Sequence, residues 1–219
     1  GASIFDTISF NNYETLRSIS IDGKTYNHLP YSEKEVSSIA SLFKDRNLNA
    51  EAFLYGNANE ISFKHNIPDY KYIHLATHGI VNEMNPNLSG IVFSQCGVVP
   101  QRQTFDDGIL FAGKMYNLDL NANLVVLSAC ETGLGKIVNG EGIMSMTRGF
   151  IYSGTPNILF SLWKIGDKNT YELMVKFYAE IIDGEPYSKA LRSAKLKLIE
   201  NEATAFPANW AGFTLVGVN

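Results

Sequence analysis

The chain carries two patterns of apolar residues, one typical of buried strands and one typical of helices. Largely apolar runs at residues 72–77, 124–127 and 157–162 each have the length of a strand. Apolar residues recur at helical spacing in segments that start near residues 32, 140, 167 and 186. Strands that are apolar on both faces and alternate with helices predict an α/β fold, in which helices cover a mostly parallel sheet.

Local signals set the bounds of the remaining predicted elements. Asp22-Gly23 is a hairpin-turn sequence, so a short hairpin is expected over residues 16–28. Ser32, followed three residues later by Glu35, forms a capping-box pattern at the start of the first helix. The other expected elements are a strand at 51–55, a short helix capped by Asn57 or Asn59 and ending near Phe63, a strand at 89–94, a helix starting within 109–116 and a closing strand at 210–216.

Composition narrows the class of protein. The chain has 219 residues, 45% of them hydrophobic and 18% charged, which is typical of one globular domain. A net charge of −4 without a basic patch argues against direct nucleic-acid binding. No apolar run approaches the roughly 20 residues of a membrane span. Two cysteines make no disulfide framework, so we expect a reducing compartment, the cytoplasm.

Residues that can carry chemistry follow two of the predicted strands. Cys130 lies in Ser128-Ala129-Cys130-Glu131-Thr132-Gly133, just after the strand at 124–127, and His78 follows the strand at 72–77. Open α/β sheets place their sites at the carboxyl ends of parallel strands. If these two strands are neighbours, the thiol and the imidazole, 52 positions apart (130 minus 78), meet at one edge. Such a pair activates a cysteine nucleophile.

Each of these residues also has a purely structural interpretation. A single buried cysteine often serves as a small apolar side chain. His78 could be a strand-end residue whose ring bonds a backbone carbonyl. His74 lies in the middle of its strand, between Ile73 and Leu75, and is expected to be a structural histidine of the core.

A zinc site built from His74, His78, Cys96 and Cys130 is a competing hypothesis. Four residues of a strand span roughly 13 Å, which is too far for two imidazoles to bind one ion at about 2 Å. The sequence therefore predicts neither a metal ion nor another cofactor.

Several ordered motifs together resemble the CHAT proteases, which are relatives of caspases and separases. The resemblance depends most on Ala76-Thr77-His78-Gly79 and on the segment from Ser128 to Gly133. The other matching segments are Leu29-Pro30, Asp107-Gly108-Ile109-Leu110, Asn117-Leu118-Asp119-Leu120, residues 124–135, Gly140-Glu141-Gly142, Ser161-Leu162-Trp163, Ala190-Leu191 with Ala194, and Trp210-Ala211-Gly212-Phe213. The interval of 52 agrees with the about 50 residues between the histidine and cysteine of caspases.

The resemblance implies a caspase-like three-layer α/β sandwich and a Cys-His dyad that hydrolyses peptide bonds. It assigns Cys130 as the nucleophile and His78 as the base that takes its proton and later protonates the leaving amine. The backbone N–H groups of Gly79 and Cys130 would form the oxyanion hole, where a glycine leaves room for the tetrahedral intermediate. Whether Glu131 tunes this dyad or faces water stays open.

The resemblance also bears on the substrate. Arginine-specific relatives carry Asp two positions before the nucleophile, where this chain has Ser128, which weakens the case for a basic P1 residue. Caspases bind Asp with a Ser-Trp-Arg stretch, to which Ser161-Leu162-Trp163-Lys164 is only similar, because lysine lacks the fork of arginine. An apolar or polar P1 residue fits as well as a charged one. We expect Trp163 to form a wall of the substrate groove and Asp167 to border it; core packing of Trp163 and helix capping by Asp167 are equally compatible with the sequence.

The expected organisation is an N-terminal extension or short hairpin over residues 1–28 and a protease domain over residues 29–219. The opening Gly1-Ala2-Ser3 resembles an expression remnant, so we expect a domain excised from a larger protein. The resemblance implies a bacterial endopeptidase that makes limited cuts in a partner protein, in some relatives for antiviral defence, under the control of a sensor or tetratricopeptide-repeat (TPR) domain. Residues 95–108 are expected to reorder on activation. A catalytically silent binding or scaffold module and a metal-dependent hydrolase are the alternatives.

Overall fold

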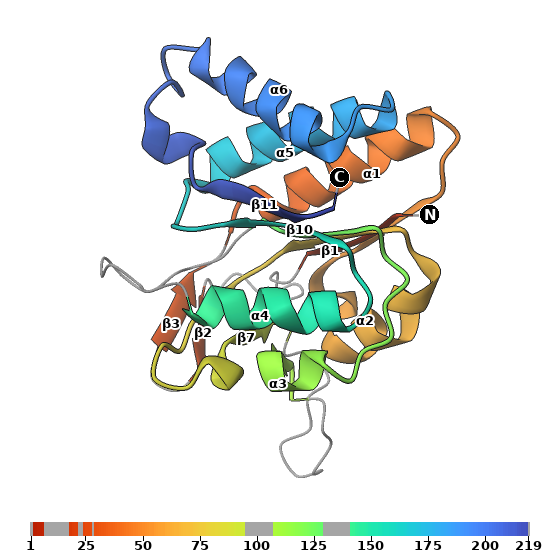
Figure 1. Ribbon diagram of the computed structural model, residues 1–219, viewed down its shortest axis with the longest axis vertical. Coiled ribbons are helices and arrows are strands. Elements are labelled where there is room, and N and C mark those ends of the chain that lie inside the picture. Colours follow the sequence, from red (N-terminus) through yellow and green to blue (C-terminus); the bar gives the residue numbers. More distant parts are fainter. Residues whose placement is uncertain are drawn as a thin grey trace.

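A central sheet organises the molecule (Figure 1). The computed structural model describes residues 2–6, 18–21, 24–27, 29–94, 107–128 and 141–218. Within them the sheet has six strands in the order β11-β10-β9-β5-β1-β4. Its strands are β1 (Ala2–Asp6), β4 (Ala50–Phe53), β5 (Tyr72–Ala76), β9 (Leu124–Leu127), β10 (Asn157–Ser161) and β11 (Phe213–Gly217).

The strand directions confirm the predicted mostly parallel sheet. β1 pairs in parallel with β4 and β5, β5 with β9, and β9 with β10. β11 alone runs antiparallel, against β10. The strand at 124–127 predicted from its apolar run is β9, with the same bounds.

Helices cover both faces of the sheet, which makes the predicted three-layer α/β sandwich (Figure 1). One outer layer holds α1 (Ser32–Asp45), α5 (Asp167–Ile182) and α6 (Tyr187–Ile199). The other holds α2 (Glu60–Asn66), α3 (Ala112–Met115) and α4 (Glu141–Tyr152). Asn59 caps α2, as predicted, by accepting the N–H of Ser62 at 2.8 Å.

Alternate residues of the central strands pack into two separate cores. Leu124 and Val126 of β9 join the core beneath α1, α5 and α6. Val125 and Leu127 join the core beneath the other helices. Strands that are apolar on both faces are what a sheet with two covered faces requires.

Two smaller sheets complete the described fold. β2 (Ser18–Ile21) and β3 (Lys24–Asn27) form the expected hairpin. β6 (Gly79–Ile80), β7 (Gly90–Val92) and β8 (Ile109–Phe111) form an antiparallel sheet directly after β5.

The structure corrects two expectations. The helix predicted to start within residues 109–116 covers only Ala112–Met115, because Ile109–Phe111 is a strand whose partner is β7. The capping box of Ser32 and Glu35 is wrong as well. Ser32 lies inside the first turn and its Oγ donates to Leu29 O at 2.9 Å, while Glu35 points into the core.

None of the helices in the described part of the chain has both the length and the apolar character that a membrane span requires.

Candidate active site

Three parallel strands of the central sheet end side by side at one edge. His78 follows β5 by two residues, Ser128 follows β9 directly, and Trp163 follows β10 by two residues. β5 and β9 are neighbours, as the sequence analysis assumed. Cys130 lies outside the described residues, as do Cys96 and Glu131, so the place of the nucleophile stays a prediction.

The backbone around His78 is held on both sides by β7. His78 is fully buried, and its carbonyl oxygen accepts the N–H of Val92 at 2.9 Å. The hydroxyl of Thr77 donates to Val92 O. Gly79, the predicted oxyanion donor, opens β6 opposite Ile91. These two bonds to Val92 fix the register of the His78 backbone against β7.

The two serines of the predicted substrate-binding group bond the backbone of the strand ends. Ser128 is 3% exposed; its N–H donates to Leu75 O at 3.1 Å and its Oγ lies 3.4 Å from the same oxygen. Ser161 is 2% exposed and its Oγ donates to Trp163 O at 2.6 Å. In this arrangement both hydroxyls hold the chain where it leaves the sheet.

Trp163 is the exposed aromatic side chain of this edge, with 38% of its surface accessible. Its Nε1 donates to Ala208 O at 3.1 Å. Its ring lies against Gly212, where an added Cβ would stand 2.8 Å from Trp163 Cε2. The segment before β11 thus sets the orientation of this indole, and the exposed face of the ring is available to a ligand.

Asp167 is the first residue of α5 and is partly exposed. Its Oδ2 accepts the N–H of Tyr31 at 2.6 Å, so the carboxylate connects the starts of α5 and α1. A negative charge at a helix N-terminus is also favourable on electrostatic grounds. Asp167 therefore has a structural function, whatever it does for a substrate.

His74 is the structural histidine that the sequence predicted. Its Nε2 lies 2.7 Å from Glu35 Oε1, and both side chains are 1% exposed. Tyr178 of α5 meets its ring edge-on, with the centroids 5.4 Å apart. Burial, with the nearby Glu35 carboxylate, raises the pKa of Tyr178 well above its usual value.

The zinc hypothesis gains no support from the described residues. The Nε2 of His74 already forms a hydrogen bond with Glu35 Oε1. The part of the chain that the structure describes contains no group of three or more His, Cys, Asp or Glu side chains placed to hold a metal ion.

A cavity of about 410 Å³ lies away from the strand ends that carry His78. Its lining comes from α2, α3 and the segments before β5 and β9: Lys64, Ile67, Pro68, Lys114, Asn117, Leu118 and Asp119. Residues that precede parallel strands belong to the amino ends of those strands, which is not where the predicted dyad lies.

Sequence patterns did not single out Glu60, the buried first residue of α2. An acidic residue in the first turn of a helix is an ordinary complement to the helix dipole, so no local signal distinguished it.

Comparisons with known proteins agree with this architecture. A family model described as the CHAT domain matches residues 8–218. Tetratricopeptide repeat protein 28 from Mus musculus is 32% identical over 109 residues, which is 50% of this chain and 4% of the relative. Tetratricopeptide repeat protein 28 from Homo sapiens matches with the same identity and coverage. The match thus spans only a small part of these relatives.

Proposed function

The chain belongs to the CHAT family of caspase-like proteases, and on that premise we propose that it is a cysteine endopeptidase whose dyad is Cys130 and His78. The observation that carries this proposal is the register of β5 and β9. Each of the four β5 residues from Tyr72 to Leu75 lies opposite the β9 residue 52 positions later, from Leu124 to Leu127. The same interval separates His78 from Cys130.

In the proposed reaction the Cys130 thiol gives its proton to His78 and attacks the carbonyl carbon of the scissile peptide bond. The oxyanion of the tetrahedral intermediate accepts hydrogen bonds from the backbone N–H groups of Gly79 and Cys130. His78 then protonates the leaving amine. Water, deprotonated by His78, hydrolyses the thioester and restores the thiol.

We propose that the substrate is a segment of a partner protein, cut at few positions. Trp163 offers an exposed aromatic face at the same edge of the sheet, which supports a role as a wall of the substrate groove. Ser128, Ser161 and Asp167 would shape the groove around it. Their backbone hydrogen bonds favour an indirect contribution, through the position of the main chain.

We propose control by a TPR-type domain. The two relatives are named for tetratricopeptide repeats, and the match spans 4% of each, which supports a longer protein as the working unit. A thiol nucleophile also fits the reducing compartment expected from the sequence. The bacterial origin and antiviral role stay predictions, since both relatives are mammalian.

Digestion of an unbiased peptide library, analysed by mass spectrometry, tests the proposed function. The protein is expected to produce cleavages that disappear in Cys130→Ala and in His78→Ala. Cleavage that persists in Cys130→Ala contradicts a cysteine endopeptidase, and its loss with a chelator would point to the metal-dependent alternative. A protein that neither cleaves the library nor shows His78-dependent alkylation of Cys130 is a binding or scaffold module.

A further inference from the structure

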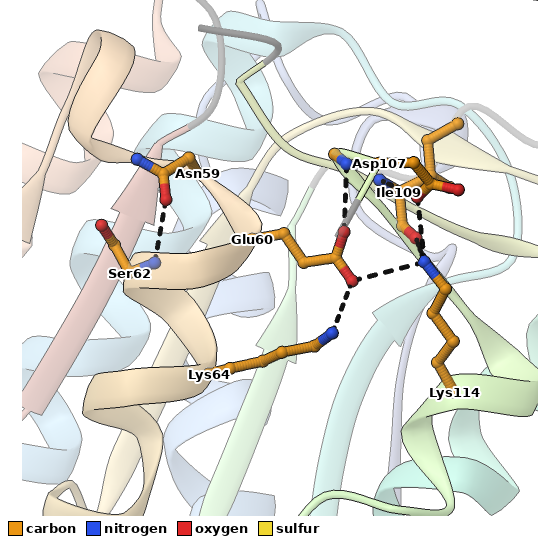
Figure 2. Close-up of polar contacts among 8 residues, drawn as sticks. Asn59, Glu60, Ser62, Lys64, Asp107, Ile109 and Lys114 are labelled. Atoms are coloured by element: carbon orange, nitrogen blue, oxygen red, sulfur yellow. Dashed lines mark hydrogen bonds and ion pairs between the residues drawn. The ribbon is translucent and has the colours of Figure 1, made fainter. Parts of the chain in front are cut away.

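Glu60 is a buried carboxylate at the junction of α2 and the small sheet. Its side chain is 1% exposed, and Figure 2 shows it between Lys64 and Lys114. Glu60 Oε2 accepts the N–H of Gly108 at 3.0 Å. Its Oε1 lies 2.8 Å from Lys64 Nζ and 3.5 Å from Lys114 Nζ. Burial of a charge is unfavourable unless partners of this kind compensate.

The helix that carries Glu60 does not need this carboxylate as a cap. Asn59 already accepts the N–H of Ser62 at 2.8 Å and caps α2 (Figure 2). The Glu60 carboxylate instead accepts a hydrogen bond from Gly108, the residue directly before β8. The sequence therefore places a charged group in the protein interior for a long-range contact, 48 residues away along the chain.

A second set of contacts strengthens this attachment. Lys114 Nζ lies 2.9 Å from Asp107 Oδ1 and donates to Ile109 O at 3.1 Å (Figure 2). Lys114 thus holds the chain on both sides of Gly108, while Glu60 holds Gly108 itself. Gly108 has φ = 78°, in the left-handed region that favours glycine.

A short series of backbone hydrogen bonds connects Gly108 to His78. Gly108 O accepts the N–H of Phe93 at 2.8 Å. The neighbouring residue Val92 donates its N–H to His78 O at 2.9 Å and accepts the hydroxyl of Thr77. β8 pairs with β7, and β7 with β6, in the same antiparallel sheet. The position of Gly108 therefore sets that of β7, and β7 sets the backbone that carries His78.

We propose that Glu60 is a positioning residue for His78, acting through Gly108 and β7 to hold the imidazole where it accepts the Cys130 proton. This role rests on the proposed function, because it concerns the proton transfer within that dyad. Glu60 would act on the dyad through the backbone, since its contacts are to Gly108, Lys64 and Lys114. Its loss is expected to let β7 move and to weaken the coupling between His78 and the thiol.

Alkylation of Cys130 by iodoacetamide, followed as a function of pH, reports that coupling directly. The experiment uses a Cys96→Ser background, so that Cys130 is the single thiol. The alkylation rate of a free thiol reaches half of its maximum near pH 8.5, where half of the thiol is thiolate. For a thiol beside an imidazolium, this midpoint lies at about pH 7.5 or below. We expect a midpoint in the lower range for the reference protein and about 8.5 for His78→Ala. Glu60→Ala is expected to raise the midpoint by about one pH unit.

The choice of variants separates positioning from general stability. Glu60→Gln keeps an acceptor for the Gly108 N–H and is expected to shift the midpoint less than Glu60→Ala. Glu60→Asp keeps the charge but withdraws it by one methylene, and should resemble Glu60→Ala. Glu180→Ala is the control, because Glu180 also pairs with a lysine, Lys197, but lies on α5 across the sheet. Circular dichroism identifies the variants that fold. If Glu60→Ala does not fold, the difference between the midpoints of Glu60→Gln and Glu60→Asp decides whether Glu60 positions His78.

The double variant Glu60→Ala/His78→Ala provides the sharpest outcome. If Glu60 acts through His78, the double variant has the midpoint of His78→Ala alone. An unchanged midpoint in folded Glu60→Ala and Glu60→Asp, or an extra shift in the double variant, overturns the positioning role and leaves the dyad intact. A reference midpoint near 8.5 that ignores His78→Ala overturns the dyad, and the positioning role with it.

Discussion

Leu75 of β5 lies opposite Leu127 of β9, and its carbonyl oxygen accepts the N–H of the next residue, Ser128, at 3.1 Å. This is the last pair of the parallel ladder between β5 and β9. In the sequence, His78 follows Leu75 by three positions and Cys130 follows Leu127 by three positions. The dyad hypothesis thus gains a topological basis in addition to its residue types.

Replacement of His78 tests the proposed dyad through the rate of peptide cleavage. General acid–base catalysis contributes about 10²- to 10⁴-fold, so His78→Ala should lower cleavage of a library-derived peptide by at least about 100-fold. Initial rates at neutral pH measure the effect. His65→Ala, on the exposed side of α2, should keep the rate. Equal rates for the two variants would remove His78 from the mechanism.

Replacement of Glu35 should destabilise the core. Glu35→Ala leaves the Nε2 of His74 without its buried partner, which costs about 2–4 kcal/mol of unfolding free energy. Glu35→Gln keeps an acceptor and should lose less than half as much. Urea denaturation measures both. Glu33→Ala, exposed on the same helix, should stay within about 0.5 kcal/mol of the parent; a Glu35→Ala variant that matches it would deny the importance of the pair.

Removal of the Tyr178 hydroxyl should stabilise the protein, increasingly so at alkaline pH. Among the described residues this buried hydroxyl has no hydrogen-bond partner, so Tyr178→Phe should gain about 1 kcal/mol at pH 7. Its raised pKa means that above about pH 10 the unfolded chain loses a proton that the folded chain retains. The parent therefore loses up to about 1.4 kcal/mol per pH unit there, and Tyr178→Phe escapes this loss.

Thermal denaturation between pH 7 and 11 follows both effects. Tyr152→Phe is the control, since that side chain is 75% exposed and its hydroxyl is expected to change little. A Tyr178→Phe variant that is less stable than the parent at pH 7 would indicate a hydrogen bond to the hydroxyl in solution.

Asp167 variants separate a structural function from a substrate function. Asp167→Ala removes the acceptor of the Tyr31 N–H and should cost about 1–2 kcal/mol of stability. Asp167→Asn keeps an oxygen in place and should recover most of this loss. If Asp167 also borders the groove, both variants change the cleavage-site preference in the library digest. A stability loss with an unchanged preference assigns it to the scaffold alone.

Gly212→Ala tests Trp163 without touching it. The new methyl group would lie 2.8 Å from the indole Cε2 and 2.9 Å from Ser161 Oγ, so the ring must move. We expect a changed cleavage-site preference, in the same direction as for Trp163→Ala. Gly166→Ala, whose methyl group meets only Asn169 Nδ2 at 3.7 Å, is the control and should behave as the parent. Preferences unaffected by Gly212→Ala and Trp163→Ala would exclude Trp163 from the groove.

The sequence predicted those elements whose burial can be inferred from their own residues alone. β9 and β10 are apolar on both faces, which identifies buried parallel strands without further information. Their carboxyl ends then locate the candidate site, because the topology of parallel sheets fixes that edge.

The remaining features depend on partners far away in the sequence. Ile109–Phe111 is a strand because β7 lies beside it, and tertiary pairing overrides its local preference. Glu35 matched a local capping pattern, yet its partner is His74, 39 residues away. Glu60 is recognisable only once Gly108 is seen at 3.0 Å. Contacts between residues far apart in the sequence produce no periodic pattern of apolar and polar positions.

The place of β1 has a consequence for how the chain reaches this structure. β1 is an interior strand of the central sheet, and its partners begin at Ala50 and Tyr72, 48 and 70 residues after Ala2. Parallel pairs so distant in sequence form slowly, because a long loop must close before any contact forms. β4 is the first partner strand to follow β1, and β5, β9, β10 and β11 then add to the other side of β1 in the order in which they are synthesised. Residues 2–6 therefore wait for their partner strands until Ala50–Phe53 and Tyr72–Ala76 have been synthesised, and during that interval the unpaired strand is open to misfolding and to chaperones.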